Sequence, residues 1–488
     1  MQLIQQIKRF PLFLFLLPLF FVFHGYTQNL ESITAGDVLQ LLGEYGLATG
    51  LLLLVFTLVF RNQNKAALFT FALMFLHFFF GAFHDTLKKI NPNFFLAKYS
   101  VLLPLLLAFF ILLFILLKHS RASFQRIFLY LNTMLLLLLL LDSPALFKKE
   151  GKQISAELPA CTTCDKPDVF LIIADEYADS ISLAQAFGYN NGAFQTQLRN
   201  RGFHLVNKSR GSYNFTPYAV ASLLGMNYLP AIKGVKTEPS DLDICYSRIN
   251  ENPLLNFFER SGYEIKNFSI FNVANQPTKA KQHYILIGKD RLVSQTLLQR
   301  LRKDLAYHLV TTLKLRSVAN YFAFYTKRCN ENLLDLFNEE VQRTSDKPRF
   351  VYTHLLMPHF PYYYDKAGRL RDASFVKDEN NYNKQAYVEY LQYGNSIFLK
   401  MIDDIIAHSA KPPIILFMGD HGFRWFDVNM KPGNPFYYMN LNAVYLPGGN
   451  YSQFYNGLSG VNQFRVLLNT SFGQHIPLLK DTSYFINE

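Results

Sequence analysis

Two residues that can bind a metal ion follow an apolar segment in the last quarter of the sequence. Asp420 and His421 come just after the apolar run at residues 414–418, and Pro412 and Pro413 precede that run. A short apolar run bounded in this way predicts a buried strand, and in open α/β sheets the chemistry gathers at the carboxyl ends of the strands. A carboxylate and an imidazole in adjacent positions there indicate a metal site.

A second acidic pair follows another apolar run. Asp175 and Glu176 come directly after residues 169–174, which have the length and composition of a buried strand. Taken alone, an acidic pair at the end of a strand is more often a solvated turn. If the two strands are neighbours, however, these carboxylates and Asp420-His421 converge on one cation. The two pairs together favour that interpretation.

Thr216 is a candidate nucleophile. It is followed by Pro217 and a run of good helix formers, which predicts Thr216 at the N-cap of a helix. The unpaired N–H groups and the dipole at that end of a helix favour an anion. A hydroxyl that also touches a divalent cation ionises more easily and can accept a phosphoryl group. The alternative is an ordinary Thr-Pro helix start, and the residues by themselves favour neither interpretation.

Two histidines accompany a third apolar run, at residues 350–357. His359 lies between Pro358 and Pro361, which fix its loop, whereas His354 falls within the run. Imidazoles at the end of a strand can donate hydrogen bonds to a phosphate or protonate a leaving oxygen. We therefore expect His359 to contact the group that reacts, and His354 to be buried support.

The elements that position these residues alternate along the chain. Apolar runs of strand length are separated by longer helical patterns, which predicts a largely parallel sheet flanked by helices. Asn252 followed by Pro253 predicts the start of one helix, and residues 380–408 have helical apolar spacing. The expected strands cover residues 169–174, 264–271, 350–357, 414–418 and 443–446.

The first 142 residues predict a membrane region. Five apolar segments there are candidate spans, of which several are near the lower length limit for crossing a bilayer. Lys and Arg are concentrated before the first segment and in alternate loops, which predicts a cytoplasmic N-terminus and an extracytoplasmic location for everything after residue 142. A cleaved signal peptide is the alternative for residues 1–26, but no small-x-small cleavage pattern follows. We expect a transmembrane region at 1–142, a linker at 143–165 and a catalytic domain at 166–488.

The formal net charge of +12 does not predict a nucleic-acid partner. Much of the basic excess lies in loops beside the apolar segments, where membrane topology explains it, and the rest is scattered. Cys161, Cys164, Cys245 and Cys329 all fall in the part expected outside the cytoplasm, where disulfides are permitted. Cys161 and Cys164 form an isolated Cys-x-x-Cys, so a zinc site with four thiolates is not expected.

The order and spacing of these motifs resemble the sulfatase-like branch of the alkaline phosphatase superfamily. The resemblance covers roughly residues 166 to 475 and rests on the segments 173–177, Thr216-Pro217, 354–361 and 418–422. It implies an alkaline phosphatase-like α/β fold. Apolar helices before an external domain also resemble the lipoteichoic acid synthases and phosphoethanolamine transferases, which transfer a lipid headgroup through a covalent phosphothreonine.

The resemblance also implies roles for individual residues. Thr216 matches the nucleophile and His359 a histidine that contacts the transferred group. Glu176 and Arg210 have less definite roles. Glu176 is expected beside the metal ligands. Arg210, together with Lys208, either neutralises a phosphate or is a surface residue. The implied metal ligands are Asp175, Thr216, Asp420 and His421.

One departure from the family bears on the substrate. Sulfatases that use formylglycine need Cys or Ser followed by a Pro and an Arg at fixed spacing, whereas this chain has Thr216 followed at once by Pro217. Threonine cannot become formylglycine, so sulfate-ester hydrolysis by that route is disfavoured.

The sequence therefore predicts a multi-pass enzyme of the plasma (inner) membrane that depends on one divalent metal ion. Oxygen-rich ligands with one nitrogen suit Mn or Zn, and Mg is also compatible. The enzyme would transfer or hydrolyse a phosphoryl-linked group of a membrane lipid or envelope glycan. The alternatives are a phosphate or sulfate ester hydrolase with water as acceptor, and an inactive protein that binds envelope polymers.

Overall fold

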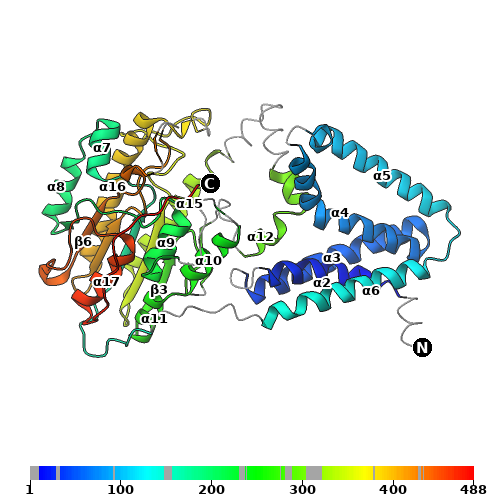
Figure 1. Ribbon diagram of the computed structural model, residues 1–488, viewed down its shortest axis with the longest axis horizontal. Coiled ribbons are helices and arrows are strands. Elements are labelled where there is room, and N and C mark those ends of the chain that lie inside the picture. Colours follow the sequence, from blue (N-terminus) through cyan, green and yellow to red (C-terminus); the bar gives the residue numbers. More distant parts are fainter. Residues whose placement is uncertain are drawn as a thin grey trace. The chain divides into compact units, whose positions relative to one another are not determined.

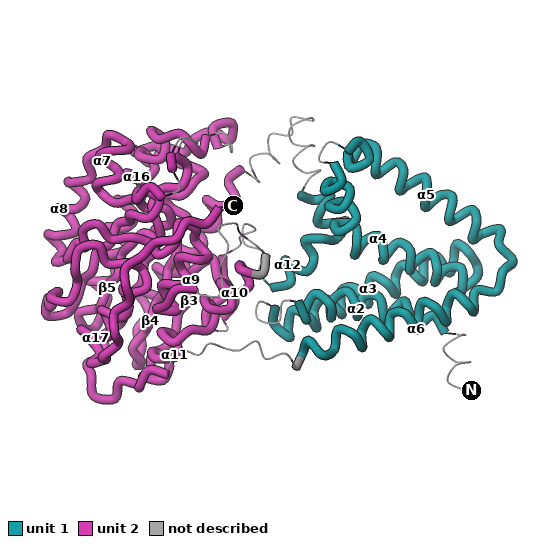
Figure 2. The backbone as a smooth tube through the Cα atoms, in the orientation of Figure 1, with its two compact units in different colours: residues 1–152, 286–315 teal, residues 153–285, 316–488 magenta. Residues whose placement is uncertain are grey.

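The chain consists of two compact units. One comprises residues 1–152 and 286–315, and the other comprises residues 153–285 and 316–488 (Figure 2). The computed structural model describes residues 10–28, 33–91, 94–147, 157–229, 237, 239–274, 276–280, 288–303, 321, 323–376, 380–426, 430–431 and 433–487. Residues 148–156 of the expected linker lie outside these ranges. The expected catalytic domain included residues 286–315, which the structure groups with the N-terminal unit.

The larger unit is built on a six-stranded sheet with the order β2-β6-β5-β1-β4-β3. β1 lies between β4 and β5 and is parallel to both, and β3 is parallel to β4. β6 is antiparallel to β5, and the short β2 is antiparallel to β6. The expected, mostly parallel sheet is confirmed. Its strands are β1 Val169–Ala174, β2 His204–Leu205, β3 Glu264–Phe268, β4 Arg349–Leu355, β5 Ile414–Met418 and β6 Asn442–Tyr445.

Burial explains the composition of the central strands. Every residue of β1, β4 and β5 is buried, because helices flank the sheet (Figure 1). Strands covered on both faces read as continuous apolar runs, and this is the pattern that predicted them. β2 has two residues, too few to produce a pattern, and it was not predicted.

The helices of this unit form two groups. α9 packs against α10, α11 and α17, while α16 packs against α7 and α15. The Asn252 side chain accepts a hydrogen bond from the Leu255 N–H and caps α11, as the sequence predicted. The helices are α7 Ser180–Phe187, α8 Gly192–Asn200, α9 Thr216–Gly225, α10 Pro239–Asn250, α11 Pro253–Arg260, α15 Tyr325–Gln342, α16 Lys384–His408 and α17 Gly460–Ser471.

The four cysteines are divided between one disulfide and two thiols. Cys161 and Cys164 are joined by a disulfide, so this Cys-x-x-Cys closes a small loop at the start of the unit. Cys245 and Cys329 are free and buried. Burial raises the pKa of the Cys245 thiol well above its usual range, which keeps it protonated and unreactive.

The N-terminal unit is helical. Within the described residues, four helices are long and apolar enough to cross a membrane, namely α3, α4, α5 and α6, the last together with the turn that follows it up to Leu146. α2 is a shorter apolar helix. The expected bundle of about five helices therefore corresponds to four long helices and one short one. Their bounds are α2 Phe13–Thr27, α3 Ala35–Phe60, α4 Gln63–Ile90, α5 Tyr99–His119 and α6 Gln125–Asp142.

A segment from late in the sequence packs on this bundle. It contains the short helix α12, Lys289–Val293, and we refer to residues 288–303 as the docked segment. Leu292 joins a buried cluster with residues of α2 and α3. The Gly81 N–H of α4 donates to the Gln295 carbonyl at 2.8 Å, and a Cβ at Gly81 would lie only 2.6 Å from that oxygen. Arg300 forms an ion pair with Asp85 at 2.5 Å, so apolar, backbone and charged contacts all hold the segment.

Candidate active site

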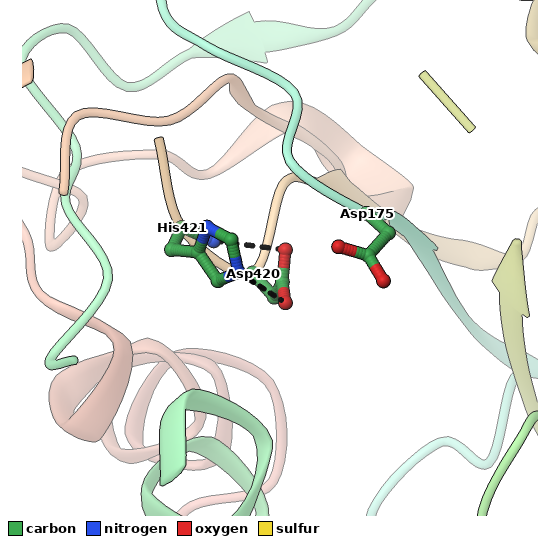
Figure 3. Close-up of side chains that lie close together, drawn as sticks. All are labelled: Asp175, Asp420 and His421. Carbon is green, nitrogen blue, oxygen red and sulfur yellow. Dashed lines mark hydrogen bonds and ion pairs between the residues drawn. The ribbon is translucent and has the colours of Figure 1, made fainter. Parts of the chain in front are cut away.

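Asp175, Asp420 and His421 lie together at the carboxyl end of the sheet (Figure 3). Asp175 follows the central strand β1, and Asp420 and His421 follow its neighbour β5. Each offers one ligand atom, these atoms lie within 4.8 Å of one another, and all three residues are buried. The sequence located these residues on separate strands, and the parallel pairing of β1 and β5 brings their side chains together.

The tautomer of His421 follows from its hydrogen bond. Nδ1 lies 2.7 Å from the Gly422 carbonyl oxygen, which can only accept, so Nδ1 carries the proton. In the neutral ring, Nε2 then presents a lone pair. Nε2 lies 3.3 Å from Asp420 Oδ2 and 3.1 Å from Thr216 Oγ1. A backbone carbonyl that orients a ring in this way is the usual second partner of a metal-binding histidine.

Asp420 has one satisfied and one unsatisfied oxygen. Oδ1 accepts hydrogen bonds from the backbone N–H groups of Glu176 at 3.0 Å and His421 at 2.9 Å. Oδ2 is buried, and no hydrogen-bond donor among the described residues reaches it. A buried carboxylate oxygen without a donor is costly unless a cation binds it. Two carboxylates and an imidazole lone pair fit Zn²⁺ or Mn²⁺ in type and burial.

Thr216 is the first residue of α9. Its Oγ1 lies 3.1 Å from His421 Nε2 and donates to Asp175 Oδ1 at 3.4 Å. The predicted N-cap position is wrong by one residue, because Phe215 is the N-cap and makes no side-chain cap hydrogen bond. The Thr216 hydroxyl is directed to the acidic cluster instead of to the N–H groups of its own helix. This places a nucleophilic oxygen beside the candidate metal ligands.

The histidine within β4 and the histidine that follows this strand differ in their surroundings. His354 is fully buried within β4, where Nδ1 lies 2.9 Å from the Tyr352 hydroxyl and Nε2 lies 3.5 Å from Asp175 Oδ2. It therefore supports Asp175 from the side of the neighbouring strand. His359 is half-buried in the following loop, and its Nδ1–H donates to the Phe360 carbonyl, which leaves Nε2 available to a ligand.

Electrostatic coupling shifts three of these groups. Burial alone would raise the pKa of Asp175, but the neighbouring histidines, with His359 first, outweigh it and hold the pKa well below its usual range. Burial raises the pKa of Glu176. Burial lowers the pKa of His359, but Asp175 and Glu176 outweigh this effect, so its pKa is raised. Without bound metal, the pocket therefore favours an ionised Asp175 and a protonated His359.

Glu176 links the two strand ends. It adopts a left-handed backbone conformation with φ of 64°, which turns its N–H toward Asp420. Its Oε1 accepts the Arg424 N–H at 2.8 Å, and its carbonyl accepts the Tyr387 hydroxyl at 2.7 Å. Tyr387 and Arg424 were not singled out from the sequence. Arg424 lies three residues after His421, a proximity that could have marked it, whereas nothing in the sequence connects Tyr387 of α16 to the turn after β1.

Arg210 lies in the segment before α9. Its backbone N–H donates to the Leu458 carbonyl at 3.1 Å, and its guanidinium lies beside Gly457. Lys208, two residues earlier, has a left-handed backbone with φ of 56° and an exposed side chain. Phosphate neutralisation by Arg210 stays a prediction.

Two glycines pack directly against the Asp420-His421 backbone. A Cβ at Gly211 would lie 2.5 Å from the Asp420 carbonyl oxygen and 3.1 Å from the His421 Cα. A Cβ at Gly419 would lie 2.6 Å from the Tyr177 carbonyl oxygen. These neighbours are all backbone atoms and cannot rotate away as a side chain can. The position of the metal-ligand pair thus depends on the absence of side chains on both sides of it.

Comparison with known proteins places this cluster within a defined region of sequence similarity. A family model described as Sulfatase matches residues 167–464, which is more than half of the 488 residues and includes every candidate site residue. No curated protein matches the sequence.

Several solved structures are similar at low identity. The C-terminal periplasmic domain of EcEptC from Escherichia coli is 13% identical, with 68% of this chain and 92% of that chain covered and a TM-score of 0.40. The C-terminal periplasmic domain of the phosphoethanolamine transferase EptC from Campylobacter jejuni is 12% identical, with 63% and 90% covered and a TM-score of 0.38. The soluble domain of lipooligosaccharide phosphoethanolamine transferase A from Neisseria meningitidis is 13% identical, with 64% and 89% covered and a TM-score of 0.39.

Proposed function

The chain belongs to the sulfatase family, and on that premise we propose that it is a membrane-anchored, metal-dependent enzyme that transfers or hydrolyses a phosphoryl-linked group through Thr216. The observation that supports this proposal best is the position of the Thr216 hydroxyl, 3.1 Å from His421 Nε2 and 3.4 Å from Asp175 Oδ1. A hydroxyl directed into a buried cluster of carboxylates and imidazoles is not needed for helix capping, so a chemical role accounts for it better.

The ligands of the ion would be Asp175, Asp420, His421 and the Thr216 oxygen. When bound, a divalent cation polarises a phosphoryl oxygen and lowers the pKa of a coordinated hydroxyl. Thr216 Oγ1 forms a bond to phosphorus as the bond from phosphorus to the leaving oxygen breaks. Thr216 would lose its proton to the solvent when the ion binds, because Asp175, whose Oδ1 accepts the hydroxyl hydrogen bond, has a low pKa and does not retain a proton. His359, whose pKa is raised, would supply a proton to the leaving oxygen.

The second half of the reaction restores the enzyme. An acceptor hydroxyl gives its proton to His359, which the first half left neutral, and attacks the phosphorus of phosphothreonine as the bond from phosphorus to Thr216 Oγ1 breaks. His359 is then protonated again and Thr216 is again ionised, as at the start of the reaction. With a sugar or lipid hydroxyl the enzyme is a transferase, and with water it is a hydrolase. Threonine cannot form formylglycine, which makes a phosphoryl-linked substrate preferable to a sulfate ester.

The helical unit bears on the class of substrate. Helices long enough to cross a membrane, on the same chain as the catalytic unit, favour a substrate that is itself in the membrane or the cell envelope. We propose a lipid headgroup or an envelope glycan as the substrate. The basic residues of the alternate loops favour a plasma (inner) membrane location with the N-terminus in the cytoplasm and the catalytic unit outside it.

Trapping the intermediate tests this proposal. Full-length protein would be incubated with Mn²⁺ or Zn²⁺ and vesicles that contain phosphatidylethanolamine and phosphatidylglycerol, and the peptide that contains Thr216 would be analysed by mass spectrometry. We expect a headgroup-derived phosphoryl adduct on Thr216, and its mass identifies the donor. Thr216→Ala should form no adduct, and its turnover should fall at least about 10³-fold. Turnover by Thr216→Ala at the wild-type rate would exclude Thr216 as the nucleophile.

A further inference from the structure

Arg424 lies beside the candidate nucleophile. It is half-buried in the loop after β5, and its guanidinium carbon is 4.5 Å from the centroid of the Phe215 ring. Phe215 is the N-cap of α9 and immediately precedes Thr216. The stacking contact therefore holds a positive charge next to the first turn of the helix that carries the nucleophilic oxygen.

The backbone of Arg424 is fixed to the same carboxylates that build the site. Its N–H donates to Glu176 Oε1 at 2.8 Å, and the Glu176 N–H donates to Asp420 Oδ1 at 3.0 Å. Glu176 is fully buried, so these hydrogen bonds are sheltered from water. The backbone at Arg424 is consequently tied through Glu176 to Asp420.

The charge of Arg424 also affects two other titratable groups. Its charge opposes protonation of His359, where burial and the carboxylates of Asp175 and Glu176 have larger effects on the pKa. It also lowers the pKa of Tyr437, which burial raises. Arg424 is thus within electrostatic reach of His359 and Tyr437 while it contacts Phe215. The contact with Phe215 is the one that places the guanidinium close to Thr216 in the chain.

The chemistry of a guanidinium suits a phosphoryl anion. A guanidinium matches the oxygens of a tetrahedral oxyanion with two parallel N–H donors, and it can stack on a ring through its flat face while its edge binds the anion. The Phe215 contact engages the flat face of Arg424.

We propose that Arg424 is a substrate-binding residue that holds the non-bridging oxygens of the phosphoryl group presented to Thr216. This inference rests on the proposed function and extends it, because it names a recognition group that the candidate metal ligands do not include. It also makes the anionic phosphoryl group, and not the rest of the substrate, the part that Arg424 recognises.

Binding of inorganic phosphate tests the inference without requiring turnover. Full-length protein in detergent with Mn²⁺ would be titrated with phosphate, and hydrolysis of p-nitrophenyl phosphate would be measured in parallel. We expect Arg424→Gln to weaken phosphate binding at least tenfold and to raise KM. Arg424→Lys should fall between wild type and Arg424→Gln, because it keeps the charge and loses the paired donors.

Two matched variants separate recognition from a structural role. Arg201→Gln removes an arginine that pairs with Asp403 on the surface, and it should leave phosphate binding unchanged. Phe215→Leu removes the stacking ring and keeps the guanidinium, so it should weaken phosphate binding less than Arg424→Gln does. If Arg424→Gln fails to fold, Arg424→Lys decides, and wild-type phosphate affinity in a folded Arg424→Lys protein overturns the proposal.

The failures of the two proposals are distinguishable. If wild type binds phosphate through Arg424 but neither turns over phosphate esters nor forms an adduct on Thr216, the proposed function fails and Arg424 is retained as an anion-binding residue. If wild type turns over the ester and folded Arg424→Gln matches it in KM and phosphate affinity, the role of Arg424 is overturned and the proposed function stands. Absence of phosphate binding by wild type also overturns the role of Arg424.

Discussion

Replacement of Gly211 by alanine should displace the candidate metal ligands without changing any of them. The added Cβ would lie 2.5 Å from the Asp420 carbonyl oxygen, and ordinary contacts begin at 3.4 Å, so the backbone must move by about 0.9 Å. Overpacking of this kind costs about 1–3 kcal/mol. That cost corresponds to a fall of several degrees in the thermal midpoint. A displacement near 1 Å can lower turnover by about 10²-fold.

Metal affinity gives the clearest readout of this displacement. The thermal midpoint would be measured across a titration of Mn²⁺ or Zn²⁺, because an ion that binds only the folded state stabilises it in proportion to the logarithm of its concentration over Kd. If metal binding is weakened 100-fold, the stabilisation at saturating ion falls by about 2.7 kcal/mol. The expected result for Gly211→Ala is a lower midpoint without metal and a smaller increase on metal addition.

Gly433→Ala is the matched control for this experiment. Gly433 is exposed in the same unit, and a Cβ there would meet no atom within 4 Å. It should preserve both the midpoint and the response to metal. If Gly211→Ala binds metal as tightly as Gly433→Ala does, then the close packing against Asp420 does not position the ligands and the reasoning is refuted.

Two other predictions concern the support of the site and its ion. Tyr387→Phe removes the hydroxyl that donates to the Glu176 carbonyl and accepts from the Ala178 N–H, so it should lower the free energy of unfolding by about 1–3 kcal/mol and also lower turnover. Thermal unfolding would be compared with that of Tyr382→Phe, which changes an exposed tyrosine. Equal thermal midpoints for the two variants would contradict this prediction. Removal of metal with a chelator should lower the thermal midpoint and abolish turnover, and Mn²⁺ or Zn²⁺ should restore both. An Asp420→Asn protein should respond much less to the chelator, and an equal response would argue against Asp420 as a ligand.

Residues that follow strands were the part of the site that the sequence could locate. Asp175 and Asp420 each come directly after an apolar run, and the polarity of parallel strands brings such positions to one edge of the sheet. The alternation of strands and helices predicted a mostly parallel sheet, but it did not predict that β1 pairs with β5. Local patterns were sufficient to locate Asp175 and Asp420 because each of them lies just after the end of its own strand.

Residues that act through contacts between distant segments could not be found in the same way. Tyr387 reaches the Glu176 carbonyl from the first turn of α16, where a tyrosine on the buried face of the helix is indistinguishable from a core residue in the sequence. Gly211 packs against Asp420, and glycine is required at this position because the backbone of Asp420 leaves no room for a side chain. The residues next to Gly211 in the sequence do not reveal this requirement. The start of α9 was misplaced by one residue for a related reason, since the Thr216 hydroxyl bonds to His421 instead of capping the helix.

The docked segment affects how the catalytic unit can be lost from the membrane. The chain passes between the two units after residues 152, 285 and 315, because residues 286–315 belong with the helical bundle. A protease that cuts once before the catalytic unit therefore leaves it bound through residues 288–303, which are held by Gly81, Asp85 and the cluster around Leu292. Separation of the two units would require two further cuts, one on each side of residues 286–315, or the release of this segment.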